Sequence, residues 1–278
     1  MFRFNNKFNS VKLVQIIVNL KRLILKYFSI YISIERIDNT DDIPSVINFL
    51  KKNRPITTEY DLIRVGGPQD GGYLIPNDLK GIKYCFSPGV DVTSDFEFDL
   101  YEKFNIRSYL SDFSVDKPGI DCDGFTFQKK YLDSKTNLTN DTLSDWIRKE
   151  NNDDEMILQM DIENFEYDVL IETSSEILKK FRIILIEFHS FDEIFTRFGF
   201  RTIKSIFDKL NKNFYIVHIH PNKCCGYSET KGLKIPPVIE YTFLRKDRVK
   251  YKKNSRQFPH ELDHDKDFVL PSNFYNIS

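Results

Sequence analysis

The 278-residue sequence has almost no net charge, because 40 Lys and Arg residues oppose 41 Asp and Glu residues. A chain without excess basic charge has no global field that attracts nucleic acid, so we expect no nucleic-acid partner. Cysteine is scarce as well. The four cysteines lack C-x-x-C spacing, and the adjacent Cys224 and Cys225 are not expected to form a disulfide with each other. This cysteine usage indicates a reducing compartment, the cytoplasm.

A long hydrophobic run free of charge is also missing. The most apolar stretch, residues 11–34, is interrupted by Lys12, Lys21, Arg22 and Lys26, and no small-residue cleavage site follows it. Its apolar side chains recur at three- and four-residue spacing, which predicts an amphipathic helix. Such a helix packs on its own domain, makes a dimer contact with a second subunit, or rests peripherally on the inner face of an anionic membrane.

The pattern of the chain changes near Arg54-Pro55, where a polar segment with a short apolar stripe ends. We therefore expect an N-terminal helical extension at residues 1–55. Residues 56–278 are long enough to bury one α/β core of their own.

Short apolar runs alternate with helix-like stretches throughout this second part. Strands are expected at residues 82–87, 106–110, 125–131, 156–160, 182–188, 214–219 and 237–244, and helices at 94–104, 143–149, 167–180 and 203–210. This alternation predicts a Rossmann-like, mostly parallel sheet with helices on both faces. The last strand is expected to pair antiparallel at the edge of the sheet.

Ligands bind to open parallel sheets outside the carboxyl ends of the strands. The first strand is followed by Ser87-Pro88-Gly89-Val90-Asp91, whose single glycine allows a sharp turn without forming a G-x-G-x-x-G motif. Asp112 follows the second strand. A carboxylate there accepts hydrogen bonds from a ribose diol, although a solvated Asp that ends a strand is equally compatible with this position.

Acids and histidines follow three further strands. They are Asp161 and Glu163, Glu187 and His189, and His218 and His220. Residues two apart on a strand share a face, so Glu187 and His189 should point the same way. The cluster predicts general-base catalysis by Asp161, His189 and Glu187, or a divalent metal held by Asp161, His189 and His220. Histidines with purely structural hydrogen bonds remain the alternative.

A glycine-rich segment, Arg64-Val-Gly-Gly-Pro-Gln-Asp-Gly-Gly-Tyr-Leu74, precedes the expected sheet. Its Asp70-Gly71-Gly72 sequence is a strong turn signal. The segment is either a β-hairpin that leads into the sheet or a loop whose Arg64, Asp70 and Tyr73 face a cofactor or an acceptor.

Five of these stretches together resemble the successive blocks of FkbM-type methyltransferases. The blocks are Arg64 to Leu74, Cys85-Phe-Ser-Pro-Gly-Val with Asp95-Phe-Glu97, Leu158-Gln-Met-Asp-Ile-Glu163 with Glu166-Tyr-Asp-Val-Leu170, Leu185-Ile-Glu-Phe-His189, and Val217-His-Ile-His-Pro-Asn222. The resemblance covers residues 60–245 and excludes the N-terminal helix. One departure is Asn164-Phe165, which stands where the family commonly has a small Gly-Ala pair.

The resemblance implies a class I methyltransferase fold and an enzyme that uses S-adenosylmethionine to methylate a hydroxyl oxygen of a sugar, glycan or natural product. It assigns the methionine part of the cofactor to Ser87, Pro88, Gly89, Val90, Asp91 and Glu97, the ribose to Asp112, and methyl transfer to Asp161. From their positions we also expect Met160 to contact the cofactor, and the acceptor to contact Arg64, Asp70, Tyr73, Glu163 and His220. The alternatives are a nucleotide-sugar glycosyltransferase or NAD-dependent enzyme, disfavoured by the missing G-x-G-x-x-G, and a non-catalytic relative that binds the cofactor.

Overall fold

The computed structural model describes residues 42–68, 71–150, 154–254 and 259–263. These residues belong to a compact unit that spans residues 38–278. Asp70 and the amphipathic helix expected at residues 11–34 lie outside the described residues, so the predictions about them stay predictions. None of the described helices is long and apolar enough to cross a membrane.

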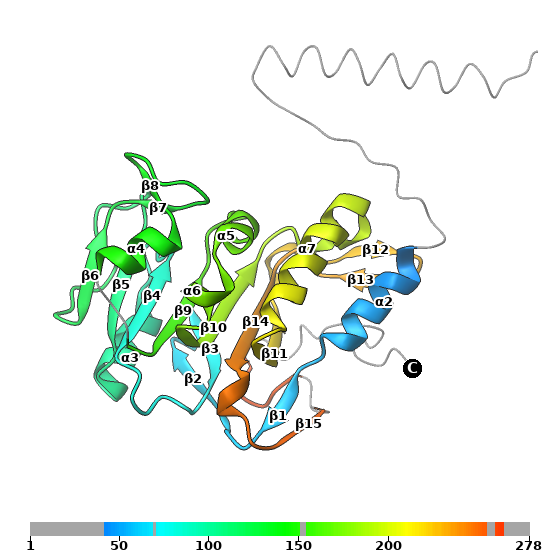
Figure 1. Cartoon of the computed structure of the whole chain (residues 1–278), viewed down its shortest axis with the longest axis horizontal. Helices are drawn as coiled ribbons and strands as arrows, with labels where there is room; N and C mark the ends of the chain where they lie inside the picture. The colour runs from blue at the N-terminus through cyan, green and yellow to red at the C-terminus, as the bar shows by residue number, and fades with distance from the viewer. Residues whose placement is uncertain (1–41, 69–70, 151–153, 255–258, 264–278) are drawn as a thin grey trace, which may run out of the picture. The chain divides into compact units, whose positions relative to one another are not determined.

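A seven-stranded sheet forms the centre of this unit, in the order β11-β14-β10-β9-β4-β5-β6 (Figure 1). Its strands are β4 (Tyr84–Pro88), β5 (Arg107–Ser111), β6 (Phe125–Gln128), β9 (Met156–Met160), β10 (Phe181–Phe188), β11 (Phe214–Pro221) and β14 (Ile239–Arg245). Neighbouring strands are parallel except where β14 pairs antiparallel with β10 and with β11. The mostly parallel α/β sheet predicted from the sequence is therefore confirmed.

The predicted edge position of the antiparallel strand is wrong. β14 lies between β10 and β11, so that β11 forms the edge. The chain leaves β11, passes through the hairpin of β12 (Ser228–Thr230) and β13 (Leu233–Ile235), and returns beside β11 in the opposite direction. A strand that turns back in this way must pair antiparallel with its predecessor, and β10 offers its other side to the same strand.

The helices lie where they were predicted, with two differences: one predicted helix is divided, and α7 begins six residues before the predicted start at residue 203. They are α3 (Asp95–Phe104), α4 (Leu143–Lys149), α5 (Glu166–Glu172), α6 (Ser175–Leu178) and α7 (Arg197–Leu210). The single helix predicted at residues 167–180 is broken between α5 and α6. Thr173 leaves the helical conformation at the end of α5, and the Ser174 side chain accepts a hydrogen bond from the Ile177 amide to start α6. Thr142 caps α4 in the same manner, since its side chain accepts a hydrogen bond from the Asp145 amide.

Helix α2 (Asp42–Lys52) falls in the stretch predicted to be an N-terminal extension, but it belongs to the core of the domain. Val46, Phe49 and Leu50 are buried, and the ring of Phe49 packs edge-on against Phe207 of α7. The apolar stripe that the sequence shows here is one face of a helix, and that face needs a partner surface. The boundary expected at residue 55 therefore does not separate α2 from the sheet.

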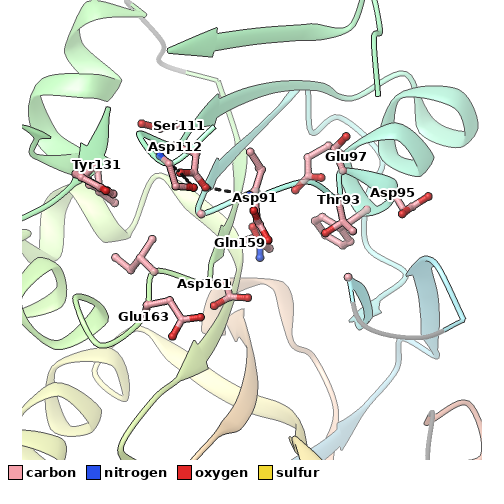
Figure 2. A pocket seen from close by; sticks show the side chains of 18 of the residues that line it. Asp91, Thr93, Asp95, Glu97, Ser111, Asp112, Tyr131, Gln159, Asp161 and Glu163 are labelled. Carbon is pink, nitrogen blue, oxygen red and sulfur yellow. Dashed lines mark hydrogen bonds between the residues drawn. The ribbon is translucent and has the colours of Figure 1, made fainter. Parts of the chain in front are cut away.

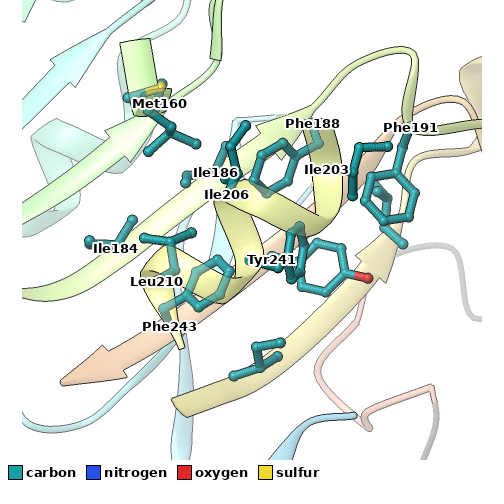
Figure 3. Packing of buried hydrophobic residues seen from close by; sticks show 14 of the residues in the cluster. Met160, Ile184, Ile186, Phe188, Phe191, Ile203, Ile206, Leu210, Tyr241 and Phe243 are labelled. Atoms are coloured by element: carbon teal, nitrogen blue, oxygen red, sulfur yellow. The ribbon is translucent and has the colours of Figure 1, made fainter. Parts of the chain in front are cut away.

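Both faces of the sheet are buried. Along β10, Ile184, Ile186 and Phe188 join the core beneath α7, whereas Ile183 and Leu185 join a second core on the other face. Figure 3 shows the first core, in which Phe188, Tyr241 and Phe243 pack against the apolar face of α7. The second core is covered by α3 and by a hairpin of β2 (Leu62–Gly66) and β3 (Gly72–Pro76). Burial on both faces explains why the central strands read as continuous apolar runs.

Smaller elements complete the described part of the chain. They are β1 (Ile56–Thr58) paired with β15 (Lys252–Asn254), β7 (Tyr131–Leu132) paired with β8 (Asn140–Asp141), and the short helices η1 (Phe191–Phe195), η2 (Lys223–Cys225) and η3 (Lys246–Arg248). In η2, Cys224 and Cys225 are joined by a disulfide. The expectation that they would stay unpaired is wrong, because this tight turn brings the two neighbouring sulfur atoms together.

Candidate functional site

A cavity of about 350 Å³ lies at the carboxyl ends of β4, β5 and β9, where the sequence predicted a ligand site. Its walls come from the loops that follow these strands, from the start of α3 and from the β2–β3 hairpin. Figure 2 shows Tyr131 and Asp112 at one end and Glu97 at the other, with Asp161 and Glu163 along a third side. The volume is within the range of small-molecule and cofactor sites.

Gly89 forms the turn between β4 and α3, and it has no room for a side chain. Its φ of +84° is one that other residues rarely adopt, and an added Cβ would lie 1.5 Å from the carbonyl oxygen of Asp161. The amide of Gly89 also donates to the Ser111 carbonyl at the end of β5. The turn therefore draws the ends of three neighbouring strands together at the cavity.

Asp112 holds the cavity's loops in place. One oxygen of its buried carboxylate accepts a hydrogen bond of 2.9 Å from the amide of Asp91, and the other accepts two bonds of 2.7 Å from the amide and hydroxyl of Ser114. Each carboxylate oxygen keeps further acceptor capacity. Asp112 can therefore organise the loops and still accept a hydrogen bond from a ligand.

A buried hydrogen-bond chain runs along one wall of the cavity. The hydroxyl of Ser87 contacts Glu97 and lies 2.5 Å from Oε1 of Gln159, whose amide donates to the hydroxyl of Tyr73. Burial raises the pKa of Glu97 to about 7 despite its bond to Ser87. Because Ser87 has one hydrogen and faces two acceptor groups, a protonated Glu97 that donates to Ser87 satisfies both contacts.

The raised pKa of Glu97 should make the stability of the fold depend on pH. An unfolded chain releases this proton near its ordinary pKa of 4.5, whereas the native protein holds it to about pH 7. Between these values the native state binds more protons, so the free energy of unfolding falls as pH rises, by about 3 kcal/mol from this group. Glu97→Gln, which keeps the shape but cannot ionise, should lose this part of the slope. Urea unfolding of both proteins at pH 5 and pH 7 measures it, and equal slopes would contradict the assignment.

The cavity is acidic. Six carboxylate residues line it and no described Lys, Arg or His does; they are Asp91, Asp95, Glu97, Asp112, Asp161 and Glu163. The remaining walls are largely apolar or aromatic, with Val90, Leu132, Ile162 and Phe165 among them. Such a cavity attracts a ligand that carries positive charge beside an apolar or aromatic group.

His189 lies beside the cavity, at the end of β10, within a group of carboxylates. Its Nε2 is 3.7 Å from Oδ1 of Asp161 and 3.7 Å from Oε1 of Glu187, as the predicted alternation along β10 requires. Its Nδ1 is 2.9 Å from the fully buried Glu166. Burial lowers the pKa of His189, but the hydrogen bond and charge of Glu166, with Asp161, raise it above its ordinary value overall. Burial and the charge of Glu187 raise the pKa of Asp161.

A second group contains His218, His220 and Asp263. Oδ1 of Asp263 is 2.9 Å from Nε2 of His218 and 3.7 Å from Nδ1 of His220. Burial raises the pKa of Asp263, but the two imidazoles lower it well below its usual range. Glu240 of β14 stands between the two groups in the sheet, opposite Glu187 on one side and His220 on the other. The structure thus brings Asp161 and His189 together with Glu187. His220, which the sequence grouped with Asp161 and His189 as a metal ligand, lies instead beside His218 and Asp263.

Some of the other predicted site residues line the cavity and others do not. Gly89, Val90, Asp91, Glu97, Asp112, Asp161, Glu163 and Tyr73 line the cavity. Met160 does not, because it is fully buried in the core on the opposite face of β9, where strand alternation must place it. Ser87 and Pro88 lie in β4 beneath the cavity. Arg64 bonds to the carbonyls of Gly67 and Leu262 outside it, and the β2–β3 hairpin predicted as one of two alternatives is confirmed.

The loop after β9 places Phe165, which the sequence marked as a departure from the family, at the cavity, and it leads to Glu166, to which the sequence prediction gave no role. Glu163 and Asn164 both adopt positive φ, a conformation that Asn tolerates better than most residues, and Phe165 reaches the cavity rim in a half-exposed position. Glu166, at the start of α5, accepts a hydrogen bond from the Ile162 amide as well as contacting His189. The sequence feature that could have identified Glu166 is its position three residues after Glu163.

A mostly parallel seven-stranded sheet with one antiparallel strand inserted beside its last strand, and with a cavity at its carboxyl edge, defines a Rossmann-like class I methyltransferase fold. Residues 111–217 match the sequence model of the methyltransferase FkbM domain. This match runs from the end of β5 into β11 and includes Asp112, Asp161, Glu187 and His189. The resemblance inferred from the blocks is thus confirmed over this segment, and residues 111–217 are those of a methyltransferase domain.

Solved structures resemble the chain only distantly. A chain in the "Structure of Pnkp1/Rnl/Hen1 complex" matches with 13% identity and a TM-score of 0.31, over 74% of this chain and 42% of that one, so this chain spans less than half of its length. The 16S rRNA (adenine(1408)-N(1))-methyltransferase from Catenulisporales acidiphilia matches with 8% identity and a TM-score of 0.31, over 66% of this chain and 98% of that one. Similarity at this level does not by itself establish a shared function. No curated protein matches the chain at a significant level.

Proposed function

We propose that the protein transfers a methyl group from S-adenosylmethionine to a hydroxyl oxygen of a sugar, a glycan or a related natural product. The observation that carries the cofactor half of this proposal is the cavity with six carboxylates and no described basic side chain. S-adenosylmethionine is positively charged at its sulfonium and at its amino group, so this cavity attracts it. NAD and nucleotide sugars carry a diphosphate, which the same carboxylates would repel.

The residues of the cavity suit the parts of this cofactor. Gly89, Val90 and Asp91 would lie along it, because the turn at Gly89 exposes backbone without a side chain. Glu97 would accept a hydrogen bond from the amino group, and this cation would offset the cost of ionising a buried carboxyl. Asp112 would bind the ribose hydroxyls with the acceptor capacity that its bonds to Asp91 and Ser114 leave over.

When bound, the cofactor supplies a methyl carbon that its sulfonium makes electrophilic. The chain's own residues must then orient the acceptor hydroxyl and take its proton. Asp161 lines the cavity and also lies 3.7 Å from Nε2 of His189, so it links the cofactor side to the histidine and carboxylate group. We assign the proton to Asp161 or to Nε2 of His189, while Glu166 holds the imidazole in position through Nδ1.

The surroundings of this group favour an acceptor rich in hydroxyls. The side chain of Glu163 is 83% exposed and lies 3.5 Å from Nε2 of His189, so the group is open to solvent on that side. Phe165 stands next to it, 49% exposed, and lines the cavity as well. Carboxylates accept hydrogen bonds from several hydroxyls at once, and an aromatic ring offers the apolar face of a sugar ring a surface to cover.

Two measurements test the proposal. Calorimetric titration with S-adenosylhomocysteine should give stoichiometric binding to the full chain. Incubation with S-adenosylmethionine labelled in its methyl group, against a panel of free sugars, glycans and nucleotide sugars, should label at least one neutral sugar through an ether bond that survives mild alkali. Absence of S-adenosylhomocysteine binding by folded protein would overturn the cofactor assignment. Label found only on amines or carboxylates would overturn hydroxyl methylation.

A further inference from the structure

Three side chains at the carboxyl edge of the sheet offer ligand atoms around one point. Asp161 follows β9, Glu187 belongs to β10, and His189 comes directly after β10. One atom from each lies within 4.8 Å of the others. Nε2 of His189 is 3.7 Å from Oδ1 of Asp161 and from Oε1 of Glu187, which is too long for a direct hydrogen bond in either case.

His189 is aimed into this space by its other nitrogen. Nδ1 lies 2.9 Å from Oε1 of Glu166, a carboxylate with no exposed surface. In a neutral imidazole this bond puts the hydrogen on Nδ1, so that the lone pair of Nε2 faces Asp161 and Glu187. The side chain of His189 is only 10% exposed, and the acids around its Nε2 among the described residues stand 3.5 to 3.7 Å away, at or beyond the limit of a direct hydrogen bond. Histidines that bind metals are held in this way by a carboxylate on the far nitrogen.

The spacing and the charge both suit a divalent cation. With bonds of about 2.1 Å, neighbouring ligands of a metal ion stand about 3 Å apart and opposite ligands about 4 Å apart. The two distances of 3.7 Å from Nε2 of His189 lie between these values. Glu163 and Glu166 add two more carboxylates within 4 Å of the imidazole, so that four acids surround His189. A cation would compensate a concentration of negative charge that is otherwise costly to bury.

We propose that Asp161, Glu187 and His189 bind one divalent cation beside the cofactor cavity. Two carboxylates with one imidazole favour an ion that accepts both oxygen and nitrogen ligands, such as Mn²⁺ or Fe²⁺. The role of this ion rests on the proposed function: at this place it would bind the acceptor hydroxyl and lower its pKa, and Nε2 of His189 would then hold the ion instead of taking the proton.

This set differs from the one predicted from the sequence, because Glu187 takes the place of His220. His220 lies with His218 and Asp263. The 2.9 Å contact between Asp263 and His218 is short enough for a direct hydrogen bond, so these two groups can satisfy each other without a metal ion. The second group nevertheless offers a matched control, since it has a carboxylate and two imidazoles in the same sheet.

The experiment measures Mn²⁺ binding to the full chain after dialysis against EDTA, by electron paramagnetic resonance of the free ion. Wild-type protein should bind one Mn²⁺ per chain. Glu187→Gln should weaken this binding by at least about tenfold, whereas Asp263→Asn, which alters only the second group, should leave it unchanged. Circular dichroism establishes that each variant is folded.

Two results would overturn the proposal. One is the absence of Mn²⁺ binding by folded wild-type protein, and the other is a loss of binding in Asp263→Asn with none in Glu187→Gln. Titration of the same samples with S-adenosylhomocysteine separates this proposal from the proposed function. Protein that binds S-adenosylhomocysteine but no Mn²⁺ disproves only the metal site, and protein that binds Mn²⁺ but no S-adenosylhomocysteine disproves only the cofactor assignment.

Discussion

Gly89→Ala is expected to reduce the affinity for S-adenosylhomocysteine by at least about 100-fold, or about 2.7 kcal/mol. The added methyl group would lie 1.5 Å from the carbonyl oxygen of Asp161 and 2.6 Å from its carbonyl carbon. Neither atom can yield, because both belong to the backbone at the end of β9. The turn must therefore move outward, and Val90 and Asp91 move with it away from the positions in which they line the cavity. Calorimetric titration measures the loss.

Gly232→Ala provides the matched control. Gly232 has a φ of +80°, close to the +84° of Gly89, but an added Cβ at Gly232 would meet nothing within 4 Å. Both variants carry the cost of alanine at positive φ, about 1–2 kcal/mol, and only Gly89→Ala adds the collision. Thermal unfolding of the two proteins separates a loss of fold from a loss of binding. Equal affinities in the two variants would show that the close approach at Asp161 does not matter for the cofactor.

His189→Gln is expected to lower methyl transfer by about 10²- to 10⁴-fold, the usual contribution of a group that assists proton transfer. Glutamine keeps a polar side chain in the space but can neither take up a proton nor keep the bond from Nδ1 to Glu166. His189 does not line the cofactor cavity, so the affinity for S-adenosylhomocysteine should stay within about threefold of wild type. Initial rates with labelled S-adenosylmethionine, at saturating cofactor and acceptor, measure the first effect, and calorimetry measures the second.

His260→Gln is the control for this substitution. His260 is a partly buried histidine in the described C-terminal segment, and its ring contacts His218 rather than His189. Its replacement should leave the rate unchanged. Full turnover in His189→Gln, or a parallel loss of cofactor affinity and rate, would remove His189 from the chemical step.

Local pattern predicted much of the fold. The seven strands and most helices were found because burial on two faces makes β9 and β10 continuously apolar, while helices such as α7 keep one apolar stripe. Once the strands were assigned, the polar residues that follow them could be placed at one edge of the sheet, because parallel strands have their carboxyl ends at the same edge. Strand alternation also predicts that Met160 does not line the cavity. Gln159 and Asp161, its neighbours in the chain, line the cavity, whereas Met160 points to the opposite face of the sheet.

The amino-acid sequence by itself determined which segments are strands, and hence that Gly89, Asp112, Asp161 and His189 meet at one edge of a sheet. Only the tertiary structure decided that β14 enters between β10 and β11, that α2 packs on α7, and that His220 joins Asp263 instead of Asp161. Periodicity is a local property that reports which face of an element is buried. Strand order and helix docking depend on pairing between residues far apart in the chain, and no local pattern records which of several similar surfaces will be the partner.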